Sequence, residues 1–351
     1  MNLAEVQLTC ADLAPALDFF AGELGFRIET IFPADDPTVA SLSGHGLRLR
    51  LAPEPGGAGV LRLPAASPSE VRVLTAPNGT RVEVFDPDPP LQVPPLEPRF
   101  ILTCAADGPQ AGEGRAGMLY RDLIPGRLGG RFIASHISIP RGGPVADWTH
   151  FHKIRFQMIF CRRGWASLVY EDQGPPFRMN AGDCVLQPPR IRHRVLESSD
   201  GFEAVEISCP ALHETLADHA IALPTATLAP DRDFSGQRFL HSVAADTPWT
   251  PHGDIGFEAR ETGMAAATAG LADARTLRAA AASGFTAPPH AGEFLFGFVL
   301  DGGVTLDCRG AHPLGPTDAF VIPPAEPWGL SEASSDLELL EVVLPAAVSA
   351  A

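Results

Sequence analysis

An internal repeat in the last two thirds of the 351-residue chain constrains the fold more than any other feature. Positions in the segment 152–164 recur 138 residues later, and positions in the segment 183–210 recur 135 residues later, so one short loop deletion accounts for the change. The matched pairs are His152/His290, Gln157/Leu295, Gly164/Gly302, Asp183/Asp318, Pro188/Pro323, His193/Trp328, Glu206/Glu341 and Pro210/Pro345. Short β-type runs separated by Gly and Pro turns lie between them, which predicts two all-β units of about 110 residues built alike.

The regions around the repeat define the expected domains. Six prolines lie between positions 87 and 98, which is typical of an extended linker. We therefore expect a small α+β module, a linker, a first barrel, a short connection and a second barrel. Their expected ranges are 1–88, 89–116, 117–222, 223–236 and 237–346. In the first module, Leu13, Leu17, Phe20 and Leu24 fall on one face of a predicted helix.

Histidines mark the first copy of the repeat. His150 and His152 are two residues apart on an extended run, so both imidazoles face one side of a sheet. Gln157 follows after an expected turn, and His193 follows a Gly-Asp turn and two prolines. If both segments line one barrel, these four side chains converge on a single cation.

The spacing H-x-H-x4-(E/Q)-x6-G followed by G-D-x4-P-x4-H resembles the two motifs of the cupin superfamily. The matching positions are His150, His152, Gln157 and Gly164, then Gly182, Asp183, Pro188 and His193. The chain departs from the family pattern at Arg190, where a glycine is usual, and at Glu197, where an asparagine is usual. The resemblance implies a mainly β fold of two tandem cupin (double-stranded β-helix, or jelly-roll) barrels with a metal site in the first.

An amide in place of the more common carboxylate bears on the metal chemistry. Three neutral imidazoles and the Gln157 amide leave a divalent ion with its full charge, which makes it a stronger Lewis acid. Such nitrogen and oxygen ligands suit Fe(II), which we favour, or Mn, Ni or Zn. Alternatively, Gln157 swings away and leaves a three-histidine site.

The second copy has lost most of these ligands. The four positions hold Pro288, His290, Leu295 and Trp328, so one imidazole remains. We expect this barrel to be degenerate and metal-free. One intact and one decayed copy resembles bicupin architectures, which include aromatic-ring-cleaving dioxygenases.

Other residues are weaker candidates around the metal. By strand periodicity, Ile159 and Cys161 share a face with Gln157 and would line a partly dry pocket. Arg155 and Arg192 lie close to ligands in a locally basic segment and are candidates to bind a substrate carboxylate. His136, on another β run, is a candidate acid or base if it points into the barrel, and otherwise a packed or exposed residue.

The segment 12–26 and the P-x-G-x-x-x-E motif ending at Glu83 resemble the vicinal oxygen chelate, or glyoxalase-like, superfamily. The resemblance places a metal ligand near Glu5, where the family usually has histidine, and another at Glu83. Because one unit and a fraction fit into this length, we expect a non-catalytic module. Pairing across a dimer is the alternative.

Bulk composition limits the partners. The formal charge of −16 argues against nucleic acid and anionic membranes. Six scattered cysteines, no signal-like N-terminus and no long apolar run indicate a cytoplasmic protein with reduced thiols. We expect a small-molecule substrate and a homo-oligomer, most simply a dimer.

Three functions remain open. The preferred one is a metal-dependent enzyme acting on a small carboxylate-bearing substrate, taken as an Fe(II) dioxygenase by architectural analogy. The second is a non-redox isomerase, lyase or hydrolase. The third is a ligand-binding or storage cupin without turnover.

Overall fold

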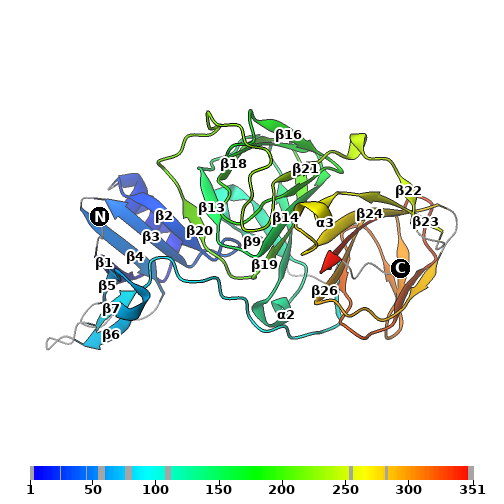
Figure 1. The fold of residues 1–351 in the computed structure, drawn as a ribbon, viewed down its shortest axis with the longest axis horizontal. Helices are drawn as coiled ribbons and strands as arrows, with labels where there is room; N and C mark the ends of the chain where they lie inside the picture. Colours follow the sequence, from blue (N-terminus) through cyan, green and yellow to red (C-terminus); the bar gives the residue numbers. More distant parts are fainter. Residues whose placement is uncertain are drawn as a thin grey trace. The chain divides into compact units, whose positions relative to one another are not determined.

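The computed structural model describes residues 4–23, 25–44, 46–53, 60–75, 81–106, 112–252, 256–280 and 284–346. The chain forms two compact units (Figure 1). The first unit comprises 1–92 together with 148–153 and 212–221, and the second comprises 93–147, 154–211 and 222–351. Among the described residues, no helix has both the length and the apolar character needed to span a membrane.

The first unit is a β-sheet with a short helical segment on one face. Its strands are β1 Glu5–Thr9, β2 Arg27–Phe32, β3 Val39–Gly44, β4 Leu47–Ala52, β5 Val60–Pro64, β6 Arg72–Thr75, β7 Arg81–Phe85, β13 His150–His152 and β20 Thr215–Ala217. They run in the order β13-β20-β2-β3-β4-β1-β5-β7-β6, with β1 parallel to β4. The apolar residues of β2 to β4 pack against Leu13, Leu17 and Phe20.

Two expectations for this unit need correction. The predicted single helix is α1 Leu13–Leu17 continued by a π-helical turn, Asp18–Glu23, and Leu24 lies outside the described residues. The module also extends beyond residue 88, because β20 hydrogen-bonds to β2 and so adds segments of the first repeat to this sheet. The β1–helix–β2–β3–β4 order agrees with the glyoxalase-like resemblance, which itself stays a prediction.

The first repeat supplies two sheets to the second unit. One contains β21 Leu240–Ser242, β17 Cys184–Leu186, β14 Phe156–Arg163, β19 Phe202–Cys209, β11 Ile133–Ile139, β10 Leu119–Asp122 and β9 Gly112–Glu113, in that order. The other contains β16 Phe177–Asn180, β15 Trp165–Tyr170, β18 His193–Ser198 and β12 Gly143–Pro144. The short helix α2, Arg127–Gly130, precedes β11.

The second repeat builds the same arrangement. One sheet contains β22 Thr250–Pro251, β23 Phe257–Glu261, β24 Asp273–Ala279, β31 Glu338–Leu344, β26 Phe294–Asp301, β29 Ala319–Val321 and β8 Ile101–Thr103. The other contains β25 Phe285–Ala287, β30 Trp328–Ser331, β27 Val304–Asp307 and β28 Ala311–Leu314. Helix α3 is Met264–Ala267, and 3-10 turns span Pro68–Glu70, Arg115–Gly117 and Ala244–Asp246.

The two barrels exchange edge strands. We expected residues 101–103 in a linker, but β8 pairs with β29 of the second barrel, and β21, expected in the second barrel, pairs with β17 of the first. Asp183 and Asp318 hold these strands in place. Each accepts a backbone N–H from its own turn and another from the residue two positions after the exchanged strand, at 2.7–2.9 Å. This structural task explains why both copies keep the aspartate.

Strand alternation separates the apolar side chains into distinct cores. Phe156, Met158 and Phe160 of β14 belong to a core shared with Phe294 and Phe296 of β26, so the two barrels pack sheet against sheet. Figure 1 shows β14 and β26 in these adjoining barrels. The alternate residues face the barrel interiors, where a second core fills the first barrel and a third fills the other.

Candidate metal centre

The structure brings three of the four predicted ligands together. The nitrogens that His150, His152 and His193 offer all lie within 4.8 Å of one another, and all three residues are buried. His150 and His152 share one side of β13 because Phe151 takes the other. His193 opens β18 after a turn in which Arg190 has φ +65°. The backbone there keeps the left-handed conformation that the family's usual glycine adopts easily.

Backbone carbonyls set the tautomer of each imidazole. His150 Nδ1 lies 2.7 Å from the carbonyl oxygen of Trp148, His152 Nδ1 lies 3.1 Å from that of Glu214, and His193 Nδ1 lies 3.0 Å from that of Ile191. A carbonyl only accepts, so each Nδ1 carries the hydrogen and each Nε2 keeps its lone pair. Metal-binding histidines are oriented in this way, so the arrangement fits a transition metal.

The side-chain amide of Gln157 is the fourth predicted ligand. It is 2% exposed and lies on β14 with Ile159 and Cys161, on the interior side of the first barrel. Its Nε2 donates to Glu206 Oε1 at 2.7 Å, whereas its buried Oε1 has no hydrogen-bond partner among the described residues. A buried amide oxygen without a donor is costly, and a cation would satisfy it. The unsatisfied oxygen agrees with the predicted amide ligand, and its binding to the same ion as the three imidazoles stays a prediction.

Glu206 is the residue that the sequence analysis missed. Strand β19 alternates between the shared core, which takes Val205 and Ile207, and the barrel interior, which takes Ala204 and therefore Glu206. Ser208 Oγ also donates to it, at 3.3 Å. The detectable signal was a carboxylate at an inward position of the run FEAVEISC, repeated in the second copy as Glu341.

Aromatic and apolar side chains close the interior around His193. Its ring stacks on that of Tyr170 at 5.5 Å, and the Tyr170 hydroxyl donates to Gln187 Oε1 at 2.6 Å. The predicted lining residues Ile159 and Cys161 lie in this interior core, together with Ile191 and Val195. Burial raises the pKa of the Cys161 thiol to about 12, so this sulfur stays protonated at neutral pH.

His136 does not enter the first barrel. Its neighbours Ile137 and Ile139 belong to the interior core, so strand alternation turns His136 towards the other barrel, where its ring lies 5.7 Å from that of Phe298. Its Nε2 lies 3.0 Å from Glu203 Oε2. The structure therefore places His136 outside the interior of the first barrel, which agrees with the alternative of a packed residue, and a role as acid or base stays a prediction.

The two candidate arginines bind acidic residues of the protein. Arg155 Nη1 lies 2.6 Å from Glu293 Oε1, which belongs to the second barrel. Arg192 Nη1 lies 3.7 Å from Glu171 Oε2. Elsewhere in the basic segment, Arg162 pairs with Glu203. The structure therefore gives these positive charges internal partners, and a role in substrate binding stays a prediction.

The second barrel has an apolar interior where the first has ligands. Leu295 and Trp328 belong to its core, and His290 Nε2 lies 2.9 Å from the Ile322 carbonyl oxygen. At Gly297 an added Cβ would lie 2.1 Å from the Phe320 ring, so this aromatic side chain fills the space beside the strand. Among the described residues, His150, His152 and His193 form the one cluster of three or more His, Cys, Asp or Glu side chains whose ligand atoms lie close enough to hold a metal ion.

Glu5 and Glu83, the candidates for a second metal site, are bridged by an arginine. Arg62 Nη1 lies 2.9 Å from Glu5 Oε1, and Arg62 Nε lies 3.2 Å from Glu83 Oε2. Cross-strand registers place all three side chains on one face of the first sheet. The guanidinium takes the place between the carboxylates that a metal would need.

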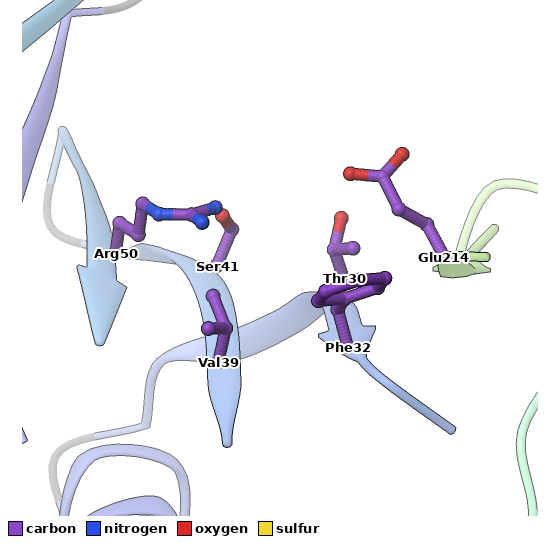
Figure 2. Close-up of a pocket in the computed structure, with 6 residues that line it drawn as sticks. All are labelled: Thr30, Phe32, Val39, Ser41, Arg50 and Glu214. Carbon is purple, nitrogen blue, oxygen red and sulfur yellow. The ribbon is translucent and has the colours of Figure 1, made fainter. Parts of the chain in front are cut away.

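The first unit also contains a pocket of about 150 Å³ on the face of β2 to β4 opposite the helix. Figure 2 shows Arg50 and Ser41 on one side, Thr30 and Phe32 near the centre, and Glu214 across from Arg50. The backbone of Glu214 is the acceptor of His152 Nδ1. Glu214 therefore both lines the pocket and accepts a hydrogen bond from a candidate metal ligand.

Comparisons with known proteins identify the architecture. No family model matches the chain, and no curated protein matches it. Among solved structures, protein Ylba from E. coli has a TM-score of 0.53 at 11% identity, covering 71% of this chain and 91% of that one. A salicylate 1,2-dioxygenase from Pseudaminobacter salicylatoxidans has a TM-score of 0.52 at 17% identity, covering 72% and 86%. The Lactobacillus farciminis oxalate decarboxylase has a TM-score of 0.52 at 12% identity, covering 72% and 87%.

These neighbours are cupin-fold proteins. The chain has the cupin fold. The prediction of a mainly β cupin architecture is thereby confirmed, and a bicupin agrees with the two barrels described above. At such low identities the similarity establishes the fold alone.

Proposed function

We propose that the protein is a metal-dependent cupin enzyme acting on a small, carboxylate-bearing organic substrate. The observation that carries the proposal is the buried histidine triad with all three Nδ1 atoms held by carbonyls. His150, His152 and His193 would hold a divalent ion, with Gln157 Oε1 as a further ligand. The ion would supply Lewis acidity and, as iron(II), one-electron chemistry with dioxygen.

The metal itself, rather than the arginines, would attract the substrate. Four neutral ligands leave its charge uncompensated by any ligand, whereas Arg155 and Arg192 already contact acidic residues. The interior side chains Ile159, Cys161 and Val195 keep the surroundings apolar, which strengthens the attraction between an ion and a carboxylate. Tyr170 supports His193 by stacking on its ring.

We favour iron(II) and a dioxygenase reaction. The support is the structural similarity to a salicylate 1,2-dioxygenase, together with the apolar side chains of the first barrel's interior. Manganese, nickel and zinc suit the same ligands. A Bacillus subtilis oxalate decarboxylase of the same fold, with a TM-score of 0.51 at 10% identity over 72% of this chain and 78% of that one, is described as having Mn(II) centres.

A non-redox isomerase, lyase or hydrolase is the second candidate. The inward carboxylate of Glu206 favours it, because such a reaction needs a group that accepts or returns a proton near the metal-bound substrate. The neutral ligand set is compatible with it, since the metal would then act only by polarising a carbonyl or a water molecule.

Metal analysis with two matched variants tests the proposal. We expect about one transition-metal ion per chain, strongly reduced in His193→Ala, because the triad loses one of three imidazoles. His290→Ala, at the position that matches His152 in the second barrel, should keep the wild-type metal content. Equal metal content in all three proteins would refute the metal centre.

Oxygen uptake separates the two reaction classes. With iron(II) restored, the preferred enzyme should consume dioxygen when offered small aromatic or aliphatic acids and should stop under anaerobic conditions. Turnover that continues without oxygen, or with zinc, would replace the dioxygenase by the non-redox enzyme. Substrate-induced stabilisation without any product would indicate a binding protein.

A further inference from the structure

A glutamate that occurs at the same position of both repeats has a different hydrogen-bond partner in each barrel. Glu206 and Glu341 are matched positions of the repeat, on the equivalent strands β19 and β31. In the second barrel Glu341 is 5% exposed and bonded to the buried guanidinium of Arg275. The register pairs Arg275 directly with Glu341, and the corresponding register in the first barrel pairs Ser135 with Glu206. The first barrel therefore lacks the arginine that neutralises the carboxylate in the second.

The partner that Glu206 has instead is the candidate ligand Gln157. The 2.7 Å bond from Gln157 Nε2 to Glu206 Oε1 uses the donor end of the amide. Because the amide is planar, anchoring its nitrogen also fixes the direction of Oε1, the buried atom for which the described residues offer no hydrogen-bond partner. Ser208 holds the same carboxylate oxygen from a neighbouring position on β19.

We infer that Glu206 is the positioning residue of the metal centre, and that it supplies through Gln157 the negative charge that the ligand set itself lacks. The inference rests on the proposed metal site. The carboxylate polarises the Gln157 amide, which makes its Oε1 a better donor to a cation and prevents the amide from rotating away. This also gives a reason for the amide at position 157, where a carboxylate is more common. In this protein the carboxylate is that of Glu206, which would be linked to the metal through its hydrogen bond with Gln157.

Cobalt(II) binding to the metal-free full chain tests this inference. Competition with a chromophoric chelator gives the affinity, and the visible spectrum of the bound ion reports its ligands. Glu206→Gln keeps an oxygen that can accept from Gln157 Nε2 but removes the negative charge behind it, and it should weaken cobalt binding on the order of 10- to 100-fold, as a change behind a metal ligand typically does. Ser208→Ala is the matched control, because it removes the other contact of Glu206 while leaving Gln157 anchored, and its affinity should be near wild type.

Exchanging the pair separates positioning from a merely structural role. The double variant Gln157→Glu with Glu206→Gln keeps one carboxylate, one amide and the hydrogen bond between them, but puts the carboxylate at the metal. We expect its cobalt affinity to return to at least the wild-type value, with a shifted cobalt spectrum. A double variant as weak as Glu206→Gln alone would overturn the inference.

The outcomes distinguish this inference from the proposed function. If His193→Ala binds cobalt like the wild type, the metal centre itself is wrong. If His193→Ala loses cobalt while Glu206→Gln keeps wild-type affinity, the metal centre stands and the role of Glu206 is wrong. If Ser208→Ala weakens binding as much as Glu206→Gln, general disturbance of β19 explains both, and the role of Glu206 is again overturned.

Discussion

At the scale of single residues, hydrogen bonds to the backbone decide what each side chain can do. The imidazoles of the triad donate from Nδ1 to carbonyls, so the lone pair that can bind a metal is on Nε2. For the thiols, burial rather than hydrogen bonding decides the protonation state, because an apolar environment penalises the charged thiolate. Burial raises the pKa of Cys161 to about 12 and that of Cys209 to about 11.

Cysteine labelling tests this burial. The thiolate is the reactive form, so Cys161 and Cys209 should resist iodoacetamide at pH 8 while the protein is folded. Cys10 and Cys104 are partly exposed and should be alkylated first. Peptide mass spectrometry after timed labelling gives the order. Prompt labelling of Cys161 in the native protein would contradict a closed barrel interior.

At the scale of elements, the paired strands β11 and β19 carry an ion cluster on the face turned to the second barrel. Glu203 accepts from Arg162 Nη1 at 2.5 Å and contacts His136 Nε2 at 3.0 Å. The hydrogen bond with His136, and the hydrogen bond and positive charge of Arg162, favour the ionised carboxylate of Glu203 more than burial disfavours it. Together they lower the pKa of Glu203 to about 2. This cluster gives His136 and Arg162 structural tasks.

The stability that Glu203 contributes should depend on pH. Its pKa is lowered from an ordinary value of 4.5, so the contribution is complete above about pH 4.5 and is lost as the pH falls through about 2. We expect Glu203→Gln to lower the free energy of unfolding at pH 7 by about 1–2 kcal/mol, since solvent screens part of the charge interaction, and the difference from wild type to shrink towards pH 2.

Urea unfolding at several pH values measures this difference. Arg163→Gln is the control, since Arg163 is exposed and 3.9 Å from Glu203 Oε1 and should change stability little. A difference between Glu203→Gln and wild type that stays constant from pH 7 to pH 3 would exclude a carboxylate with a strongly lowered pKa.

At the scale of the whole molecule, the two barrels of the second unit share one core. Phe294 is fully buried and stacks on Phe132 of the first repeat at 4.3 Å. The exchanged strands β8 and β21 add hydrogen bonds between segments of different repeats. Neither barrel is therefore complete without residues from the other part of the chain. The homo-oligomer and the small-molecule substrate expected from the sequence stay predictions. Light scattering measures the oligomeric state.

The barrels should unfold together. Phe294→Ala removes a buried aromatic ring and should lower the free energy of unfolding by about 3–5 kcal/mol. We expect far-UV circular dichroism and the fluorescence of Trp165 and Trp328, which lie in different barrels, to report one transition for this unit. Separate transitions at the two tryptophans would show that the barrels are independent. Metal content per folded chain should be unchanged, because Phe294 faces away from the interior.

Local sequence patterns determined the repeat, the β character and the three histidines. The period-two alternation of β14 predicts which of its residues face the barrel interior. The spacing of the two motifs predicted that His193 lies close to His150 and His152, because short turns and strands limit how far apart these residues can be. The loss of ligands in the second barrel was also readable from single positions such as Leu295 and Trp328.

Only the tertiary structure decided which barrel each edge strand completes, and which charged side chains neutralise each other. The sequence does not show which sheet strand β8 joins, because its three residues, two of them apolar, could pair with any open sheet edge. The pairs Arg155–Glu293 and Gln157–Glu206 join residues separated by 138 and 49 positions. Pairing at such separations depends on how sheets pack, and no local pattern in one chain encodes that choice.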